Sequence, residues 1–178
     1  SFEEQAGPAL IPYISHILET ITFAFEKYQQ NNTVMLLDTV CTLADAVGGE
    51  LAAQEHINKL MPCLMKRWNS ITDNDRGLIP LFECLTYVFR ALGTASQSFA
   101  LPVFTRCVNI LDAMYSGEAG INYDAELSDF ITCSLDLMCS LTEALAAGLD
   151  PLVVSRSHSG ATLLQLLFVA MRDRRQEV

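Results

Sequence analysis

Six cysteines are the first candidates for chemistry in this 178-residue chain. They stand at positions 41, 63, 84, 107, 133 and 139. None forms a Cys-x-x-Cys pair, and all lie in apolar runs at helical spacing, which favours buried free thiols over zinc ligands or disulfides. The three histidines, His16, His56 and His158, pair with no cysteine or carboxylate at metal-ligand spacing. The sequence therefore predicts neither a metal site nor a cofactor.

Asp38 and Asp45 are the strongest candidates for acid–base catalysis. In a helix they would share one face, about 10 Å apart along the axis. That spacing suits paired carboxylates, but no cluster that would stabilise an electrophile accompanies them. The sequence also lacks the phosphate-binding, nucleophile-elbow and zinc-protease motifs. We expect no enzymatic activity, so these carboxylates are better candidates for binding.

Composition limits the class of partner. Hydrophobic residues make up 51% of the chain, enough for a continuous core, and charged residues (18%) interrupt every stretch long enough to span a bilayer. The formal net charge of −10 argues against nucleic acid and favours a basic partner. The alternative is ordinary acidic solubility. We expect no membrane span and no secretion signal.

A nonapeptide with a proline near its start occurs three times. The copies read LIPYISHIL, LMPCLMKRW and ALPVFTRCV, and their prolines are Pro12, Pro62 and Pro102. The intervals of 50 and 40 residues bracket the period of roughly 40–47 residues expected for HEAT-type helix pairs. Proline is tolerated in the first turn of a helix, so each copy is expected to begin one.

The repeat predicts an all-α fold, a HEAT-repeat α-solenoid built as a superhelical stack of antiparallel helix pairs. A second amphipathic helix follows each proline copy, and Gly48 and Gly93 are expected to end two of these second helices. Residues 1–178 then form a single segment of about four repeats. Their bounds are 1–6 (the tail of a preceding helix), 9–48, 54–93, 98–147 and 150–178 (incomplete). Both ends look like cuts through a longer solenoid.

The second helices carry matching polar stripes. Aligning TLADAVG, YVFRALG and SLTEALA gives three sets at offsets of 0, +4 and +7, which share a helix face. The sets are Asp38/Thr42/Asp45, Glu83/Tyr87/Arg90 and Asp136/Ser140/Glu143. Stacked repeats would place them side by side as a mostly carboxylate ladder. A solvent-facing stripe is polar in any case, but five acidic residues among six charged ones favour a basic ligand.

Several segments resemble the transportins, the karyopherin-β2 branch of the importin-β family of nuclear import receptors. They include FAFEKYQ, LLDTVCTLADAVG, LMPCLMKRWN, IPLFECL and FTRCVNIL. The resemblance runs nearly end to end and is weakest at 115–128 and around 155–165. It implies a receptor of about twenty HEAT repeats, of which this chain is a central piece.

The resemblance also implies a ligand and a site. Such receptors bind extended basic localisation signals ending in Pro-Tyr, often from RNA-binding cargo proteins, along their second helices. Glu4 and Asp38 match the carboxylates that meet the signal's arginine. The matching positions for the rest of the signal are Asp45, Glu83, Asp136, Glu143 and Thr132. Thr132 departs from the family, which has isoleucine there, so hydrophobic anchoring is in doubt at that position.

Other family functions are implied to lie outside the chain. The Pro-Tyr pocket and the surface for the Ran GTPase belong to earlier repeats, a tryptophan site for the signal's N-terminal end belongs to later ones, and nucleoporin contacts also fall elsewhere. The implied localisation is shuttling between cytoplasm and nucleus, with no direct contact to nucleic acid. Trp68 stands in a first helix, so it is expected to pack between repeats.

A structural scaffold is the competing interpretation. A HEAT subunit of the phosphatase-scaffold kind holds partners on its ridge, so its signal would stand in the turns between helices. The turns here are QQNN, TDND and SHSG, and they contain little that would indicate a partner-binding site. The acidic stripes along the second helices favour the receptor.

Overall fold

The computed structural model describes residues 7–27, 30–116, 125–145 and 150–172. Within these ranges the chain is helical and has no strand, and its one β-type contact is an isolated bridge between Arg156 and Thr162. The prediction of an all-α fold is confirmed. The chain divides into two compact units, Ser1–Ser96 and Gln97–Val178. The predicted acidic loop at 116–126 and both predicted cut ends fall almost wholly outside the described residues.

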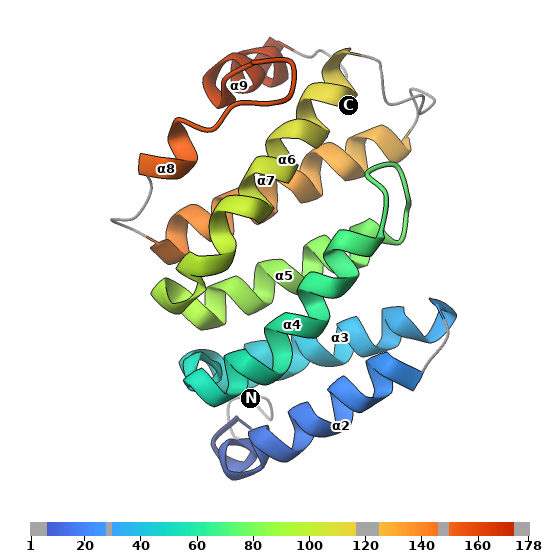
Figure 1. Cartoon of the computed structure of the whole chain (residues 1–178), viewed down its shortest axis with the longest axis vertical. Helices are drawn as coiled ribbons and strands as arrows, with labels where there is room; N and C mark the ends of the chain where they lie inside the picture. Colours follow the sequence, from blue (N-terminus) through green and yellow to red (C-terminus); the bar gives the residue numbers. More distant parts are fainter. Residues whose placement is uncertain (1–6, 28–29, 117–124, 146–149, 173–178) are drawn as a thin grey trace. The chain divides into compact units, whose positions relative to one another are not determined.

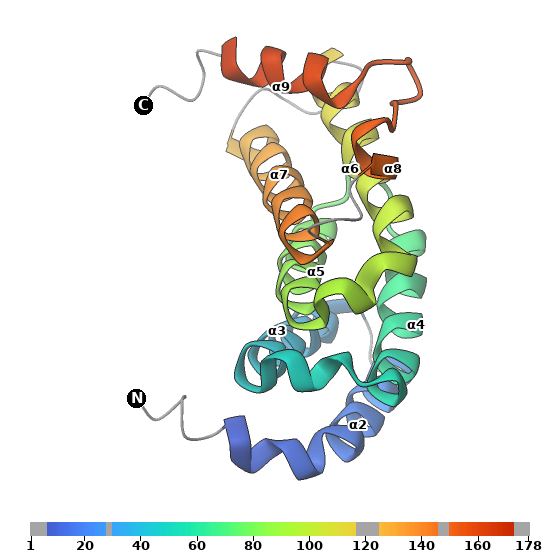
Figure 2. The same cartoon turned by 90° about the vertical axis from the view of Figure 1, so that its left-hand side faces the viewer.

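The first unit consists of two helix pairs in two layers. One layer holds α2 (Ile14–Lys27), which follows the short helix η1 (Ile11–Tyr13), and α4 (Gln54–Ser70). The other holds α3 (Gln30–Val47) and α5 (Leu78–Leu92), and η2 (Gly48–Ala52) connects α3 to α4. Figures 1 and 2 show α2 beside α4 and α3 beside α5. First and second helices therefore present separate faces.

The core of this unit lies between the two layers. Helix α5 contacts α3, α4 and η2. Four of its side chains are therefore 0% exposed, namely Leu78, Leu81, Phe82 and Leu85. Trp68 of α4 is 2% exposed and meets Phe82 edge to face, with ring centroids 5.5 Å apart. The geometry is the one that aromatic quadrupoles favour. Trp68 and Phe82 belong to the two helices of one pair, so this contact lies within a repeat, whereas the position of Trp68 in a first helix predicted packing between repeats.

Two glycines end the second helices of this unit. Gly48 follows α3 with φ +50°, and Gly93 follows α5 with φ +52° and donates its N–H to the Phe89 carbonyl. Positive φ is strained for residues that carry a Cβ, so glycine is required at both turns. The sequence identified both correctly. Helix α3 begins at Gln30, earlier than the QQNN turn suggested.

The predicted place of two prolines was wrong. Pro62 and Pro102 lie inside α4 and α6, not in a first turn, whereas Pro12 does stand at the start of η1. Both interior prolines are exposed. Proline removes one hydrogen bond to the carbonyl four residues earlier, and on a solvent-facing side water can satisfy that carbonyl. The outer face of a first helix is therefore where an interior proline costs least.

The second unit is one helix pair with two short additions. Helix α6 (Gln97–Ser116) follows η3 (Gly93–Ser96) and packs along α7 (Ala125–Leu145). Both α8 (Asp150–Val153) and α9 (Leu163–Arg172) contact α6. The turn between α8 and α9 is fixed to α6 by Asn109, whose Oδ1 accepts the His158 backbone N–H at 2.8 Å.

One helical stretch in the described residues, Leu78–Ser116, is long and apolar enough by composition to cross a membrane. Half of its apolar window is buried inside the protein. The turn at Gly93 and the short helix η3 also divide it into α5 and α6. Core packing accounts for its composition, because these helices supply many of the buried side chains.

The Trp68–Phe82 contact generates a stability prediction. Replacing Phe82 with alanine should lower the free energy of unfolding by about 3–5 kcal/mol, because it leaves a cavity beneath Trp68. Trp68 is the only tryptophan, so its emission reports unfolding in denaturant. The control is Tyr13→Ala, whose side chain is 61% exposed and whose loss should change stability by no more than about 0.5 kcal/mol. Equal midpoints for the two variants would contradict this packing.

Candidate functional site

The second helices of the first unit present one polar face. Asp38, Thr42 and Asp45 of α3 are all exposed, and so are Glu83, Tyr87 and Arg90 of α5. Their opposite sides supply the core, with Leu37, Val40 and Leu43 of α3 buried against α5. Helical periodicity therefore forces both stripes outward. The structure places these six residues as the sequence predicted.

A hollow of about 260 Å³ lies between α3 and α5 on this face. Asp38 and Glu83 line it from opposite helices, and Cys41 and Pro80 also line it. Val34 and Met35, which also line it, are 50% and 72% exposed. We name this feature the acidic hollow. It combines two carboxylates with an exposed apolar rim, which fits the charged head and aliphatic stem of an arginine or lysine.

A pair of thiols lies between the two helices beside the acidic hollow. The Cys84 thiol donates a hydrogen bond to Cys41, which lowers the pKa of Cys41. Burial and the nearby charges of Asp38 and Glu83 oppose this shift. The pKa of Cys84 is raised well above its usual value, first by that hydrogen bond and then by burial. Cys41 is therefore the more acidic of the two.

The second unit carries the remaining described candidates on α7. Thr132, Asp136 and Glu143 are exposed. Ser140, which the alignment of stripes placed with them, is buried at 0% exposure and donates its hydroxyl to the Leu137 carbonyl at 2.9 Å. An offset of four residues turns a position about 40° around the helix. A short serine there is covered by its neighbours, whereas Thr42 and Tyr87 at the same offset reach solvent.

Glu4 lies outside the described residues. The cysteines in the described ranges form no disulfide. Cys84 and Cys107 are buried, but Cys139 is exposed, so the prediction of buried thiols was wrong for that residue. Within those ranges no group of three metal-ligating side chains exists. With carboxylates from α3 and α5 and an exposed apolar rim, the face of the second helices can attract and hold a cationic, partly apolar ligand.

Sequence reasoning missed the exposed apolar rim of the acidic hollow. Val34 and Met35 belong to an apolar run that reads as ordinary core. Two consecutive apolar residues in a helix point about 100° apart, and here Leu37 and Val40 already fill the core side. The signal that was available is that 34–37 is a continuous apolar stretch, which a one-sided helix cannot bury completely.

Known proteins show the same sequence pattern over the whole chain. The chain is 39% identical to Transportin-1 of Homo sapiens over 183 residues, which covers 100% of this chain and 20% of that protein. It is 39% identical to Transportin-1 of Oryza sativa subsp. japonica and 37% identical to Importin subunit beta-2 of Schizosaccharomyces pombe, each over 99% of the chain. No family model matches the chain.

Paired helices whose first members form one layer and second members another define the HEAT-repeat α-solenoid class. Identity of 37–39% to animal, plant and fungal relatives places the chain within that class. The chain is transportin-type and belongs to the importin-β family. It spans about a fifth of the length of the curated relatives it matches.

The thiol pair generates a reactivity prediction. At pH 8, iodoacetamide should alkylate Cys41 faster than Cys63, because burial raises the pKa of Cys63 to about 11. Cys84→Ala removes the hydrogen-bond donor, so the pKa of Cys41 should rise and its alkylation should slow. Cys84→Ser keeps a donor and should preserve the rate. Peptide mapping by mass spectrometry measures each site, and an unchanged rate in Cys84→Ala would contradict the hydrogen bond.

Proposed function

We propose that the chain is the part of a nuclear import receptor that holds the basic portion of a cargo localisation signal. The ligand is an extended, arginine- and lysine-rich segment of the Pro-Tyr type, and the binding face is that of the second helices. No chemical reaction is involved. The acidic hollow is the observation that carries the proposal, because carboxylates from two helices, Asp38 of α3 and Glu83 of α5, line the same hollow.

The chemistry of the acidic hollow supports a basic side chain over other ligands. A guanidinium entering between Asp38 and Glu83 would meet a carboxylate from each helix, and its methylene stem would lie on Met35 and Val34. Asp45 lies two turns along α3, about 10 Å further, which is the reach of three extended residues. Successive basic residues of an extended peptide can thus meet successive carboxylates.

The remaining site residues extend the proposal along the chain. We propose that the N-terminal part of the signal meets three residues of α7, namely Asp136, Glu143 and Thr132. We propose that Glu4 meets the arginine of the signal. In the full-length receptor, Ran binding drives release of the cargo, and contacts with nucleoporins support passage through the pore. These contacts are proposed for the rest of the protein. The localisation proposed is shuttling between cytoplasm and nucleus.

The isolated chain should bind a complete signal more weakly than the full-length protein does. A disordered ligand loses conformational entropy on binding, so several linked epitopes must contribute. Removing one of them forfeits an effective-concentration gain of about 10²–10⁴. Fluorescence anisotropy with one labelled signal peptide compares the two proteins. Equal affinities would place the whole site within this chain.

Charge reversal tests the face directly. In the full-length protein, Asp38→Lys with Asp45→Lys should weaken a basic signal by about tenfold, because two exposed attractions become repulsions. Both residues are exposed, so the fold should be unaffected. The loss should shrink as salt rises, since the Debye length falls from about 10 Å at 0.1 M to about 3 Å at 1 M. Titration at several salt concentrations measures both effects.

The matched control makes the same charge change on the first helices. Glu26 and Glu55 are exposed residues of α2 and α4, and reversing both to lysine should leave the affinity for the signal unchanged. Equal losses in the two double variants would mean that only net charge matters. Unchanged affinity in the Asp38/Asp45 variant would remove this face from the site and favour a scaffold.

A further inference from the structure

The first helices of the first unit enclose a groove of opposite character. It lies between α2 and α4, has a volume of about 390 Å³, and reaches the start of α3 at Thr33. Lys59, Lys66 and Arg67 line it. We name it the basic groove. These three residues are half of the six lysines and arginines in Ser1–Ser96, so cations are concentrated here in a chain of net charge −10.

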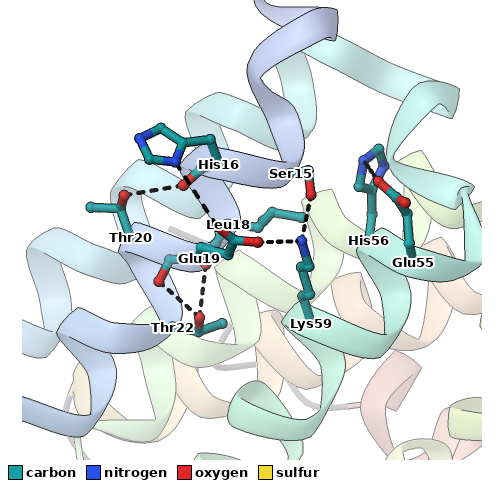
Figure 3. A network of polar contacts seen from close by, with 9 residues as sticks. All are labelled: Ser15, His16, Leu18, Glu19, Thr20, Thr22, Glu55, His56 and Lys59. Carbon is teal, nitrogen blue, oxygen red and sulfur yellow. Dashed lines mark hydrogen bonds and ion pairs between the residues drawn. The ribbon is translucent and has the colours of Figure 1, made fainter.

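Lys59 is already neutralised within the protein. Its ammonium reaches across from α4 to α2, where it donates to Glu19 at 2.7 Å and to Ser15 (Figure 3). The hydrogen bond from Lys59 lowers the pKa of the Glu19 carboxyl. This pair ties the two walls of the basic groove together. Lys59 therefore positions the walls rather than offering a free charge.

Lys66 and Arg67 are the available cations. Lys66 is exposed, and with the described residues it forms no ion pair. The Nε of Arg67 is buried and has no hydrogen-bond partner. A buried donor without a partner is destabilising, so Nε favours an acceptor that enters the groove. Rotation of the guanidinium into the groove would present Nε and a terminal nitrogen together, the pair that binds a carboxylate side-on.

The other lining groups leave this positive charge largely uncompensated. Among the described residues that line the groove, Glu26 is the one carboxylate. The Cys63 thiol donates to the Leu60 carbonyl at 2.9 Å, and burial raises its pKa to about 11, so it stays neutral at physiological pH. Phe25 and Pro62 add apolar wall. The groove thus offers two cations, one anion and an apolar surface.

We propose that the basic groove binds an acidic linear segment of a partner protein, with one glutamate or aspartate carboxylate held by Arg67 and Lys66. The volume admits a side chain and its neighbours, within the lower part of the range for ligand sites. Charge complementarity selects the occupant, because the basic signal proposed for α3 and α5 would be repelled here. The two faces of the unit therefore take partners of opposite charge.

Titration of the full-length protein with a fluorescein-labelled twelve-residue Glu/Gly/Ser peptide tests this inference. Lys66→Gln with Arg67→Gln should weaken binding at least about tenfold, the loss of one charge-assisted hydrogen bond. Glu26→Gln should strengthen it about twofold or more, because it removes the competing carboxylate. Misfolding could explain a loss of affinity but not a gain. A loss in the Lys66/Arg67 variant together with a gain in the Glu26 variant therefore rules out misfolding as their common cause. Affinity for the basic signal should not change.

Arg90→Gln with Arg172→Gln is the matched control. Both residues are exposed, neither lines the groove, and the same two charges are lost. An equal loss in this control overturns the proposal in favour of net charge. A glutamine version of the peptide that binds equally well overturns it too. If millimolar inorganic phosphate displaces the peptide and peptide length has no effect on affinity, the groove is a phosphate site and the proposal is overturned. Preferential binding of an RNA oligomer with the same variant sensitivity would assign the groove to RNA.

Discussion

The structure of the first unit depends on the burial of α5 between its neighbours. Phe82, Leu85 and Phe89 have no solvent exposure, and Trp68 of α4 closes over Phe82. Burying such aromatic and aliphatic side chains contributes about 1.5–3 kcal/mol each, so α5 cannot rotate without losing much of the core. Glu83 and Tyr87 are held outward by the same packing. The acidic face is therefore a by-product of the core, fixed in place by hydrophobic contacts.

Helix periodicity explains why so much could be predicted. Buried positions of α3 and α5 recur every three or four residues, and the glycines at 48 and 93 occupy turns with positive φ. Both patterns are local, so the helices, their ends and the outward direction of Asp38, Asp45 and Glu83 follow from single segments. The family resemblance rests on equally local segments, and identity of 37–39% to known relatives supports it.

What could not be predicted depends on neighbours distant in sequence. The short side chain of Ser140 is covered, although its helical offset matches that of exposed Thr42. Pro62 is tolerated in the interior of α4 because that side of the helix faces solvent. The Cys41–Cys84 hydrogen bond joins residues 43 positions apart. Packing of one helix against another decides each case, and a helical repeat in the sequence carries no record of it.

The charge sorting of the first unit follows from its two-layer construction. A net charge of −10 suggests a uniformly acidic protein, yet Lys66 and Arg67 lie on the first-helix layer and Asp38 and Glu83 on the second. Packed helix axes are about 8–10 Å apart, and the Debye length is about 8 Å at physiological ionic strength. A ligand approaching through solvent therefore responds mainly to the layer it meets. Lowering the salt would let the two layers offset each other, so the sign of each face is best resolved at moderate ionic strength.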